Sequence, residues 1–367
     1  MDGVPIAFCD HLCDLLGMDA LQGAKELSGL YGQLAQCTFE HAVDYICSVE
    51  DGIEEDREVR YEWNDRKVEA PKIDDIPKKF VREVWVYLLD AKHEKVSREL
   101  VRRFPYATYH FVLTTSSINE AWVDVALSLN KLQRVWITKK LDDDALRLFQ
   151  KLVKGKKLCK LFISPEACEG GTVEVQKSLL LQEQFDLLEI SNLEHLSTWN
   201  TAPVREILEY WTENSEEVRG KRLIVTGDCK KGVKQLEKFL LKGARSSATL
   251  SLSKGPSSSI FATLLRIPGV GSLLRRRLRI RSVLKVCSKE ECDFIDKYYL
   301  HNYYTFCKPS CVYKYEEGDE EAKRRLYISF ECDKDGELHH MWRPASHNGL
   351  KDLALMRDTC FLHILFA

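Results

Sequence analysis

The sequence predicts an α/β solenoid, in which parallel strands alternate with helices in repeats of about 26 residues, preceded by a small helical module. Three observations predict it. Strand-like apolar segments recur at a nearly constant spacing, the segments between them have helical periodicity, and the first 45 residues carry no strand pattern. Of the 367 residues, 44% are apolar and 30% are charged, which excludes a largely disordered chain.

Seven segments have the composition of short buried strands and share one register. Counting from residue 132, the spacing to the next three segments is 26, 27 and 35 residues, and a further 26 leads to the last. Two more segments precede residue 132 at steps of 26. The predicted strands cover residues 80–86, 106–112, 132–138, 158–164, 185–191, 220–226 and 246–252.

The segments between these strands predict amphipathic helices. In the first of them, apolar residues fall at positions i, i+3, i+4, i+7 and i+11 from Ile118, which places them on one helical face. Asp142 is placed to cap the second helix. Thr201 is the predicted N-cap of another helix, with Pro203 in its first turn, and Gly243 predicts the end of the last.

One strand and one helix in each unit of roughly 20–29 residues is the pattern of leucine-rich repeats. Only the Leu-x-x-φ-x-φ part of that motif is present (φ is an apolar residue), so the array over residues 78–254 would be degenerate. Such units bury their apolar faces by stacking, and their parallel strands line a concave face. A doubly wound α/β domain is the alternative, and the constant spacing favours the solenoid.

The helical module covers residues 1–47. Val4 and Pro5 open it, and Phe8, Leu12 and Leu15 then fall on one side of an amphipathic helix. An apolar residue and Pro, followed by such a helix and a Leu-rich turn, resembles an F-box, a module that commonly precedes leucine-rich repeats. The chain, including VYKYEEGDEEAKRRLYISFEC and the closing FLHILFA, resembles expanded families of F-box-like paralogues in nematodes.

The resemblance implies a non-enzymatic adaptor, the substrate-recognition subunit of an SCF-type ubiquitin ligase. It implies that a Skp1-like adaptor protein receives the apolar anchors Val4, Pro5, Phe8, Leu12 and Leu15 in a groove. The concave face would hold a protein target through outward strand positions, for which the candidates are Arg134, Trp136, Lys160, Phe162, Leu187 and Glu189. One sequence leaves open which alternation faces outward.

A repeat scaffold without a ligase role is the second hypothesis. In that case the first helices only cap the solenoid. The two hypotheses differ in whether the first 45 residues expose an apolar face.

Two flanking regions differ from the repeats. Residues 48–77 predict a linker, with an acidic solvated loop over 49–56 and a hairpin that pairs 58–63 with 67–69 around Asn64-Asp65. Residues 286–367 predict a C-terminal cap. It would contain an aromatic-rich helix over 290–304 and a hairpin that pairs 311–317 with 324–332 around Gly318, with a further turn at Asp335-Gly336.

Residues 255–285 predict a basic loop or an insertion into the array. Ile267-Pro268-Gly269-Val270-Gly271 resembles the hairpin of helix-hairpin-helix DNA-binding modules, and five arginines follow it. A nucleic-acid binder that uses segment 264–281 is therefore a third hypothesis. The motif is single and the net charge of the chain is −2, so nucleic acid is a disfavoured partner.

No common catalytic motif is present, and no catalytic residue, cofactor or metal site is predicted. Cys287, Cys292, Cys307 and Cys311, with His301 between them, are candidate zinc ligands. Their spacing lies at the edge of the usual range, so buried structural cysteine is the favoured interpretation. The thirteen cysteines, without a signal peptide or a membrane-length apolar run, predict free thiols in the cytoplasm or nucleus and no membrane contact.

Overall fold

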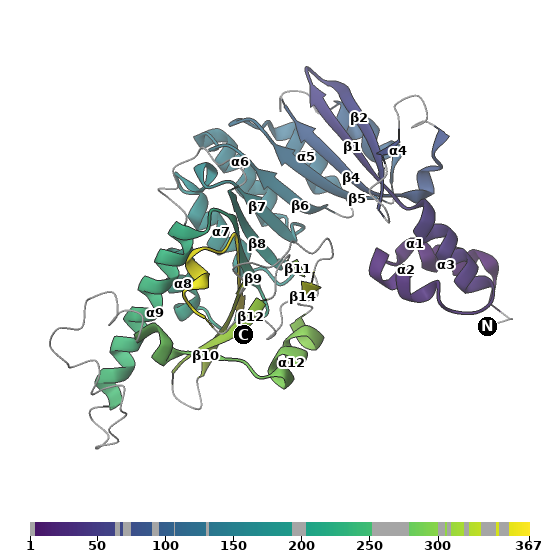
Figure 1. Ribbon diagram of the computed structural model, residues 1–367. Coiled ribbons are helices and arrows are strands. Elements are labelled where there is room, and N and C mark those ends of the chain that lie inside the picture. Colours follow the sequence, from purple (N-terminus) through teal and green to yellow (C-terminus); the bar gives the residue numbers. More distant parts are fainter. Residues whose placement is uncertain are drawn as a thin grey trace. The chain divides into compact units, whose positions relative to one another are not determined.

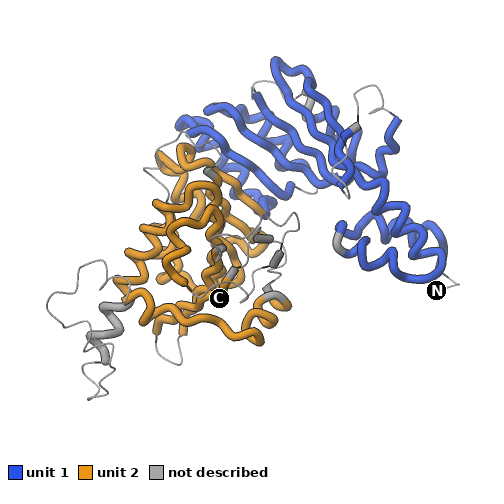
Figure 2. The backbone as a smooth tube through the Cα atoms, in the orientation of Figure 1, with its two compact units in different colours: residues 1–159 blue, residues 160–367 orange. Residues whose placement is uncertain are grey.

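The computed structural model describes residues 4–62, 67–68, 75–89, 95–105, 107–129, 132–192, 203–251, 279–299, 305–306, 310–318, 323–331, 343–344 and 352–367. The chain forms two compact units, residues 1–159 and residues 160–367, which Figure 2 distinguishes by colour. Both are α/β units with open sheets (Figure 1).

The first unit begins with three short helices, α1 (Ile6–Leu15), α2 (Met18–Ala24) and α3 (Leu30–His41). They pack around a small core of Cys13, Leu21, Ala24 and Ala35, of which all but Ala24 are fully buried. Three short helices with mostly small core side chains bury only a limited apolar area. The stability of this module therefore depends on its attachment to the rest of the unit.

A six-stranded sheet follows, in the order β3-β2-β1-β4-β5-β6. Strands β1, β4, β5 and β6 are parallel, whereas β2 pairs antiparallel with both β1 and β3. Alternate burial along β4 and β6 is expected of strands that bury one face more than the other. The strands are β1 (Val43–Glu50), β2 (Ile53–Tyr61), β3 (Lys67–Val68), β4 (Val81–Leu88), β5 (Thr108–Leu113) and β6 (Leu132–Ile137).

Helices cover the fully buried face of this sheet (Figure 1). Phe111 of β5 meets Trp122 of α5 edge-on, with ring centroids 5.4 Å apart, and Tyr45 of β1 packs against Phe104, which follows α4. The described helical elements here are η2 (Lys78–Phe80), α4 (Lys95–Arg103), α5 (Glu120–Ser128) and α6 (Asp143–Lys154).

The second unit contains strands in the order β7-β8-β9-β15-β13-β12-β10. Strands β7, β8 and β9 are parallel, and the chain terminus returns as β15, which pairs antiparallel with β9 and β13. The strands are β7 (Lys160–Ile163), β8 (Leu187–Asn192), β9 (Arg222–Gly227), β10 (Leu284–Val286), β12 (Ser310–Glu317), β13 (Arg324–Glu331) and β15 (Phe361–Phe366), with a separate pair of β11 (Thr305–Phe306) and β14 (Arg343–Pro344).

Helices lie on both faces of the second sheet. Trp211 of α8 packs near Phe239 of α9 and Phe366 of β15, whereas α12 places Cys292 and Ile295 against Leu365, which points to the other face. The elements are η3 (Glu166–Cys168), α7 (Thr172–Leu180), α8 (Val204–Glu213), α9 (Lys230–Ser251), α12 (Lys289–Tyr299) and η6 (Leu355–Arg357).

Much of the predicted secondary structure is confirmed. The first six predicted strands correspond to β4 to β9, and the predicted hairpin around Gly318 is the pair β12–β13. Asp142 caps α6 by accepting a hydrogen bond from the Ala145 backbone N–H at 2.7 Å. The aromatic-rich helix is α12, and strand β3 pairs with β2 where a returning strand was predicted.

Three local predictions are wrong. Residues 246–251 of the predicted strand 246–252 are helical, because α9 runs through Gly243 and ends at Ser251. The acidic run 49–56 is not a loop: the hairpin of β1 and β2 occupies it, turning at Asp51 and Gly52 with positive φ. Pro203 is the N-cap of α8 and not a residue of its first turn.

Several predicted features lie outside the described residues. They are Thr201, the turns at Asn64-Asp65 and Asp335-Gly336, and residues 264–278 of the basic segment.

Candidate functional site

Helix α1 presents apolar side chains to solvent. Val4 is 39% exposed, Phe8 58% and Leu15 59%, while Pro5 is exposed and Leu12 is half-buried. We call these five residues the docking stripe. The helix buries its other side through Cys9 and Cys13, so the stripe is not needed for the core of the module.

Arg82 of β4 attaches this helix to the sheet. Its guanidinium donates hydrogen bonds to the backbone carbonyls of Cys13 at 2.6 Å and Leu16 at 3.0 Å, and also to that of Asp14. The Arg82 side chain is only 14% exposed. Burial lowers its pKa, and the nearby Asp14 carboxylate opposes that shift, so the arginine stays charged.

The sheet face opposite α4 and α5 carries a cluster of aromatic and charged side chains. The rings of Trp85 on β4 and His110 on β5 stack with centroids 4.3 Å apart, and the guanidinium of Arg134 lies 4.7 Å from the Trp85 ring centroid. Glu83 Oε2 lies 3.1 Å from His110 Nε2. The same oxygen accepts a hydrogen bond from Trp85 Nε1 at 3.2 Å. The predicted target-binding residue Arg134 therefore belongs to a four-residue cluster.

Trp136, the second predicted residue on β6, lies in the next row of the same face. Val112 pairs with Trp136 on one side and with Tyr87 on the other, which aligns two half-buried aromatic residues across three strands. Tryptophan, tyrosine and arginine are the residue types that contribute most to protein interfaces. This face therefore has the composition of a binding surface.

Two carboxyl groups lie beside this cluster. The side chains of Asp44 on β1 and Glu62, just after β2, interact by a hydrogen bond, and Glu83 is the register neighbour of Asp44 on β4. Burial is the main reason that the pKa of Asp44 is raised, and Glu83 and Glu62 add to it. Burial also raises the pKa of Glu62, with a further contribution from Glu83. Two carboxyl groups in contact favour a shared proton.

The remaining predicted target-binding residues lie in the second unit. Lys160 and Phe162 of β7 and Glu189 of β8 are half-buried and belong to one face, because Phe162 pairs with Glu189 in register. Leu187 is only 1% exposed and has no surface to present to a target. The prediction of Leu187 as a binding residue is thus not supported by its position, since both Leu187 and Leu188 of β8 are buried.

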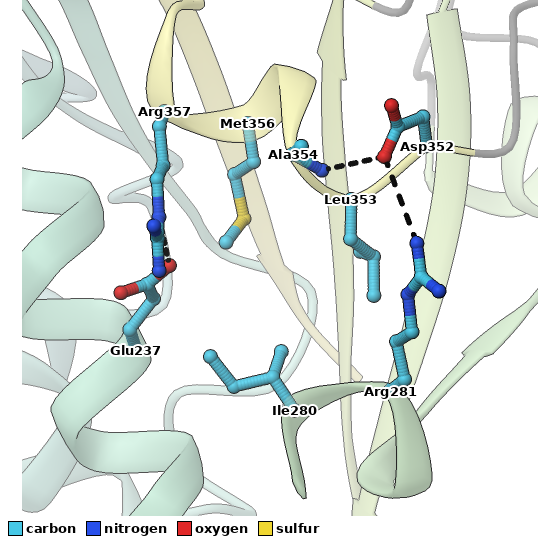
Figure 3. A pocket seen from close by; sticks show the side chains of 8 residues that line it. All are labelled: Glu237, Ile280, Arg281, Asp352, Leu353, Ala354, Met356 and Arg357. Carbon is cyan, nitrogen blue, oxygen red and sulfur yellow. Dashed lines mark hydrogen bonds and ion pairs between the residues drawn. The ribbon is translucent and has the colours of Figure 1, made fainter. Parts of the chain in front are cut away.

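A cavity of about 200 Å³ lies in the second unit between α9 and η6 (Figure 3). Glu237 Oε1 accepts a hydrogen bond from Arg357 Nε at 2.7 Å on one side, and Arg281 and Asp352 form a 3.8 Å ion pair on the other. Apolar residues lie between the two pairs: Ile280, Leu353 and Met356. Both arginines are paired with carboxylates, so the cavity has balanced charge and is no strong anion site.

The cysteines of the described regions show no metal-binding arrangement. Cys287 and Cys292 are buried with Val312 and Leu365 in a hydrophobic cluster, and Cys311 is buried too, whereas Cys307 and His301 lie outside the described residues. Burial raises the pKa of the Cys287 thiol to about 12, which keeps it protonated. No group of three or more potential metal ligands occurs within the described ranges.

No helix in the described part of the chain is both long enough and apolar enough to cross a bilayer. Comparison of the chain with protein-family models, curated proteins and solved structures gave no match.

Sequence reasoning missed Arg82, Trp85 and His110. Arg82 acts on carbonyls 66–69 residues earlier in the chain, a separation at which no local pattern exists. Trp85 and His110 belong to strands that were predicted correctly. Their proximity to Arg134 follows from the strand register, which one sequence leaves open.

Proposed function

We propose that this protein is a non-enzymatic interaction adaptor that docks through its N-terminal helices and holds a target protein on its strand faces. The observation that carries the proposal is the docking stripe. Phe8 and Leu15 are each more than half exposed on a module whose core is formed by other residues, Cys13 and Leu21 among them. An exposed row of large apolar side chains costs solubility and is typical of a binding surface.

A helix that presents anchors at positions i, i+4 and i+7 suits a groove in a partner protein. Phe8, Leu12 and Leu15 have this spacing. On the F-box resemblance, the partner would be a Skp1-like adaptor and the protein would recruit targets to an SCF-type ubiquitin ligase. The plain scaffold hypothesis requires these side chains to be covered by the repeats, and their exposure favours docking instead.

The strand faces would form the target platform as a degenerate leucine-rich-repeat-like array. The parallel neighbours β4, β5 and β6, each followed or preceded by a helix on one face, support this in the first unit. The antiparallel strands β12, β13 and β15 in the second unit do not belong to such a repeat and would form a cap. The platform residues are Arg134 and Trp136, with Lys160, Phe162 and Glu189 as further candidates.

The test is a binding measurement with purified Skp1-like protein. Phe8→Asp should weaken binding by about 2 kcal/mol or more, which is roughly 30-fold, because buried apolar anchors dominate helix-in-groove interfaces. The melting temperature should stay the same, since Phe8 is exposed. Leu181→Asp is the matched control, because Leu181 is an exposed leucine of the second unit, at the end of α7.

Leu21→Asp separates docking from folding. Leu21 is fully buried in the helical core, so this variant should unfold the module and abolish binding together. A truncated protein should lack residues 1–40 and no more. Strand β1 begins at Val43 and pairs with both β2 and β4, so it has to be kept. The ligase proposal fails if the wild-type protein captures no Skp1-like partner, or if Phe8→Asp binds as tightly as wild type.

A further inference from the structure

The C-terminal end of α1 has only one local cap, a hydrogen bond at 3.3 Å from the Leu16 backbone N–H to the Cys13 carbonyl. It has no basic residue in its last turn, and its C-cap residue Leu16 is extended. Gly17 follows, but its φ is −73°, so it does not form the left-handed cap that glycine commonly supplies. The last carbonyls of a helix need hydrogen-bond donors, and the negative end of the helix dipole favours a cation there.

Arg82 supplies both from another element. Its side chain reaches the carbonyls of Cys13, Asp14 and Leu16, and an Asp14 carboxylate oxygen lies 4.0 Å from Nη1. A guanidinium carries five N–H donors in a fixed fork, so it can hold several acceptors in one orientation. The direction of α1 relative to β4 is therefore tied to the orientation of one buried guanidinium.

A second polar link, among the residues that the structure describes, is weaker. Lys79 approaches the Asp10 carboxylate at 3.6 Å, with half of the lysine side chain exposed, and such surface pairs contribute little to stability. His41 and Phe80 stack with ring centroids 5.1 Å apart, and Cys13 of α1 packs against Ala35 of α3 in the small core of the module, so apolar packing also limits α1 but gives it no directional polar anchor. Arg82 is thus the buried polar contact through which α1 is held.

We propose that Arg82 is a positioning residue that fixes the docking stripe in one orientation relative to the sheet of the first unit. This inference rests on the proposed function, because the orientation of α1 serves a purpose only if α1 docks on a partner protein. An adaptor must hold its two partners at a defined separation. A docking helix that could rotate relative to the sheet would bind its partner but would not hold it in one position relative to the target. The affinity for the docked partner and the orientation of the docked partner are then separate properties of this protein.

The experiment measures orientation directly in the full chain. Spin labels are placed through non-canonical amino acids at His11 of α1 and Glu99 of α4, both exposed, because the thirteen cysteines preclude thiol labelling. Pulsed electron resonance gives the distance distribution between them. We expect one narrow distribution in the wild type and a distribution about twice as broad in Arg82→Ala, since loss of the charged hydrogen bonds frees the helix.

Hydrogen exchange provides a second measurement. Amides in the last turn of α1 should exchange roughly tenfold faster in Arg82→Ala, because several charge-assisted hydrogen bonds are lost. Arg82→Lys keeps the charge but has no planar group of donors. Its exchange rate in the last turn of α1 should therefore lie between those of the wild type and Arg82→Ala. Arg102→Ala is the control, because Arg102 is an exposed arginine of α4. Affinity for a Skp1-like partner should change by no more than about twofold in all variants.

An unchanged narrow distribution in Arg82→Ala overturns the proposal, and so does an equal broadening in Arg102→Ala. If the wild-type protein binds no Skp1-like partner, the proposed function fails. The distance measurement still decides whether Arg82 positions α1.

Discussion

The contact between Asp44 and Glu62 predicts that the first unit becomes less stable as pH rises. Burial raises the pKa of Asp44 to about 8 and that of Glu62 to about 7, and the neighbouring Glu83 carboxylate adds to both shifts. An unfolded chain ionises these groups near pH 4. Between about pH 4 and 8 the folded state therefore binds more protons than the unfolded state, and the free energy of unfolding falls with rising pH.

The replacement Asp44→Asn removes the acid and keeps the shape of the side chain. Its amide can donate a hydrogen bond to the Glu62 carboxylate at any pH. One pKa unit corresponds to about 1.4 kcal/mol, and the two raised values belong to the pair jointly, so we expect a gain on the order of 3 kcal/mol at pH 8. The gain should vanish below about pH 4, where Asp44 is protonated in both states.

Hydrogen exchange of the backbone amides in β1 and β2 is the suitable assay, because it reports local stability even if the two units unfold separately. Rates are measured from pH 5 to 8.5 and corrected for the intrinsic dependence on pH. Glu26→Gln, at an exposed site of the helical module, is the control and should track the wild type. Parallel curves for wild type and Asp44→Asn across this range would refute the shared-proton interpretation.

Two further changes test the packing of the second unit. Leu161→Asp places a charge at a fully buried position of β7 and should cost several kcal/mol in a urea titration, whereas Lys234→Asp on the exposed side of α9 should leave the midpoint unchanged. Gly243→Ala would usually stabilise a helix by about 1 kcal/mol, but here the new Cβ would meet the hydroxyl of Tyr315 at 1.9 Å, so the melting temperature should fall. Tyr315→Phe should restore most of the loss, and a stabilised Gly243→Ala protein would contradict the packing described for α9.

The local elements of this chain follow from its sequence, because their causes lie within a few residues. A strand such as β6 alternates in burial with a period of two, and Asp142 begins α6 because its carboxylate reaches a backbone amide three residues on. The hairpin of β12 and β13 likewise needs only two strand segments and a glycine, Gly318, with positive φ. The helix over Ile6–Leu15 was predicted in the same way, from the spacing of Phe8, Leu12 and Leu15, whereas the docking role of these residues stays a prediction.

Only the tertiary structure decided features that depend on distant residues. The acidic segment of β2 is a strand because it pairs with β1, and its Glu54 carboxylate is held by Arg103 at 2.9 Å. Gly243 lies inside helix α9, where it gives room to the hydroxyl of Tyr315, 72 positions later in the chain. Arg82 caps a helix far away in sequence, and β15 returns between β9 and β13. Such contacts are selected by the packing of the whole unit, whose energy no local pattern contains.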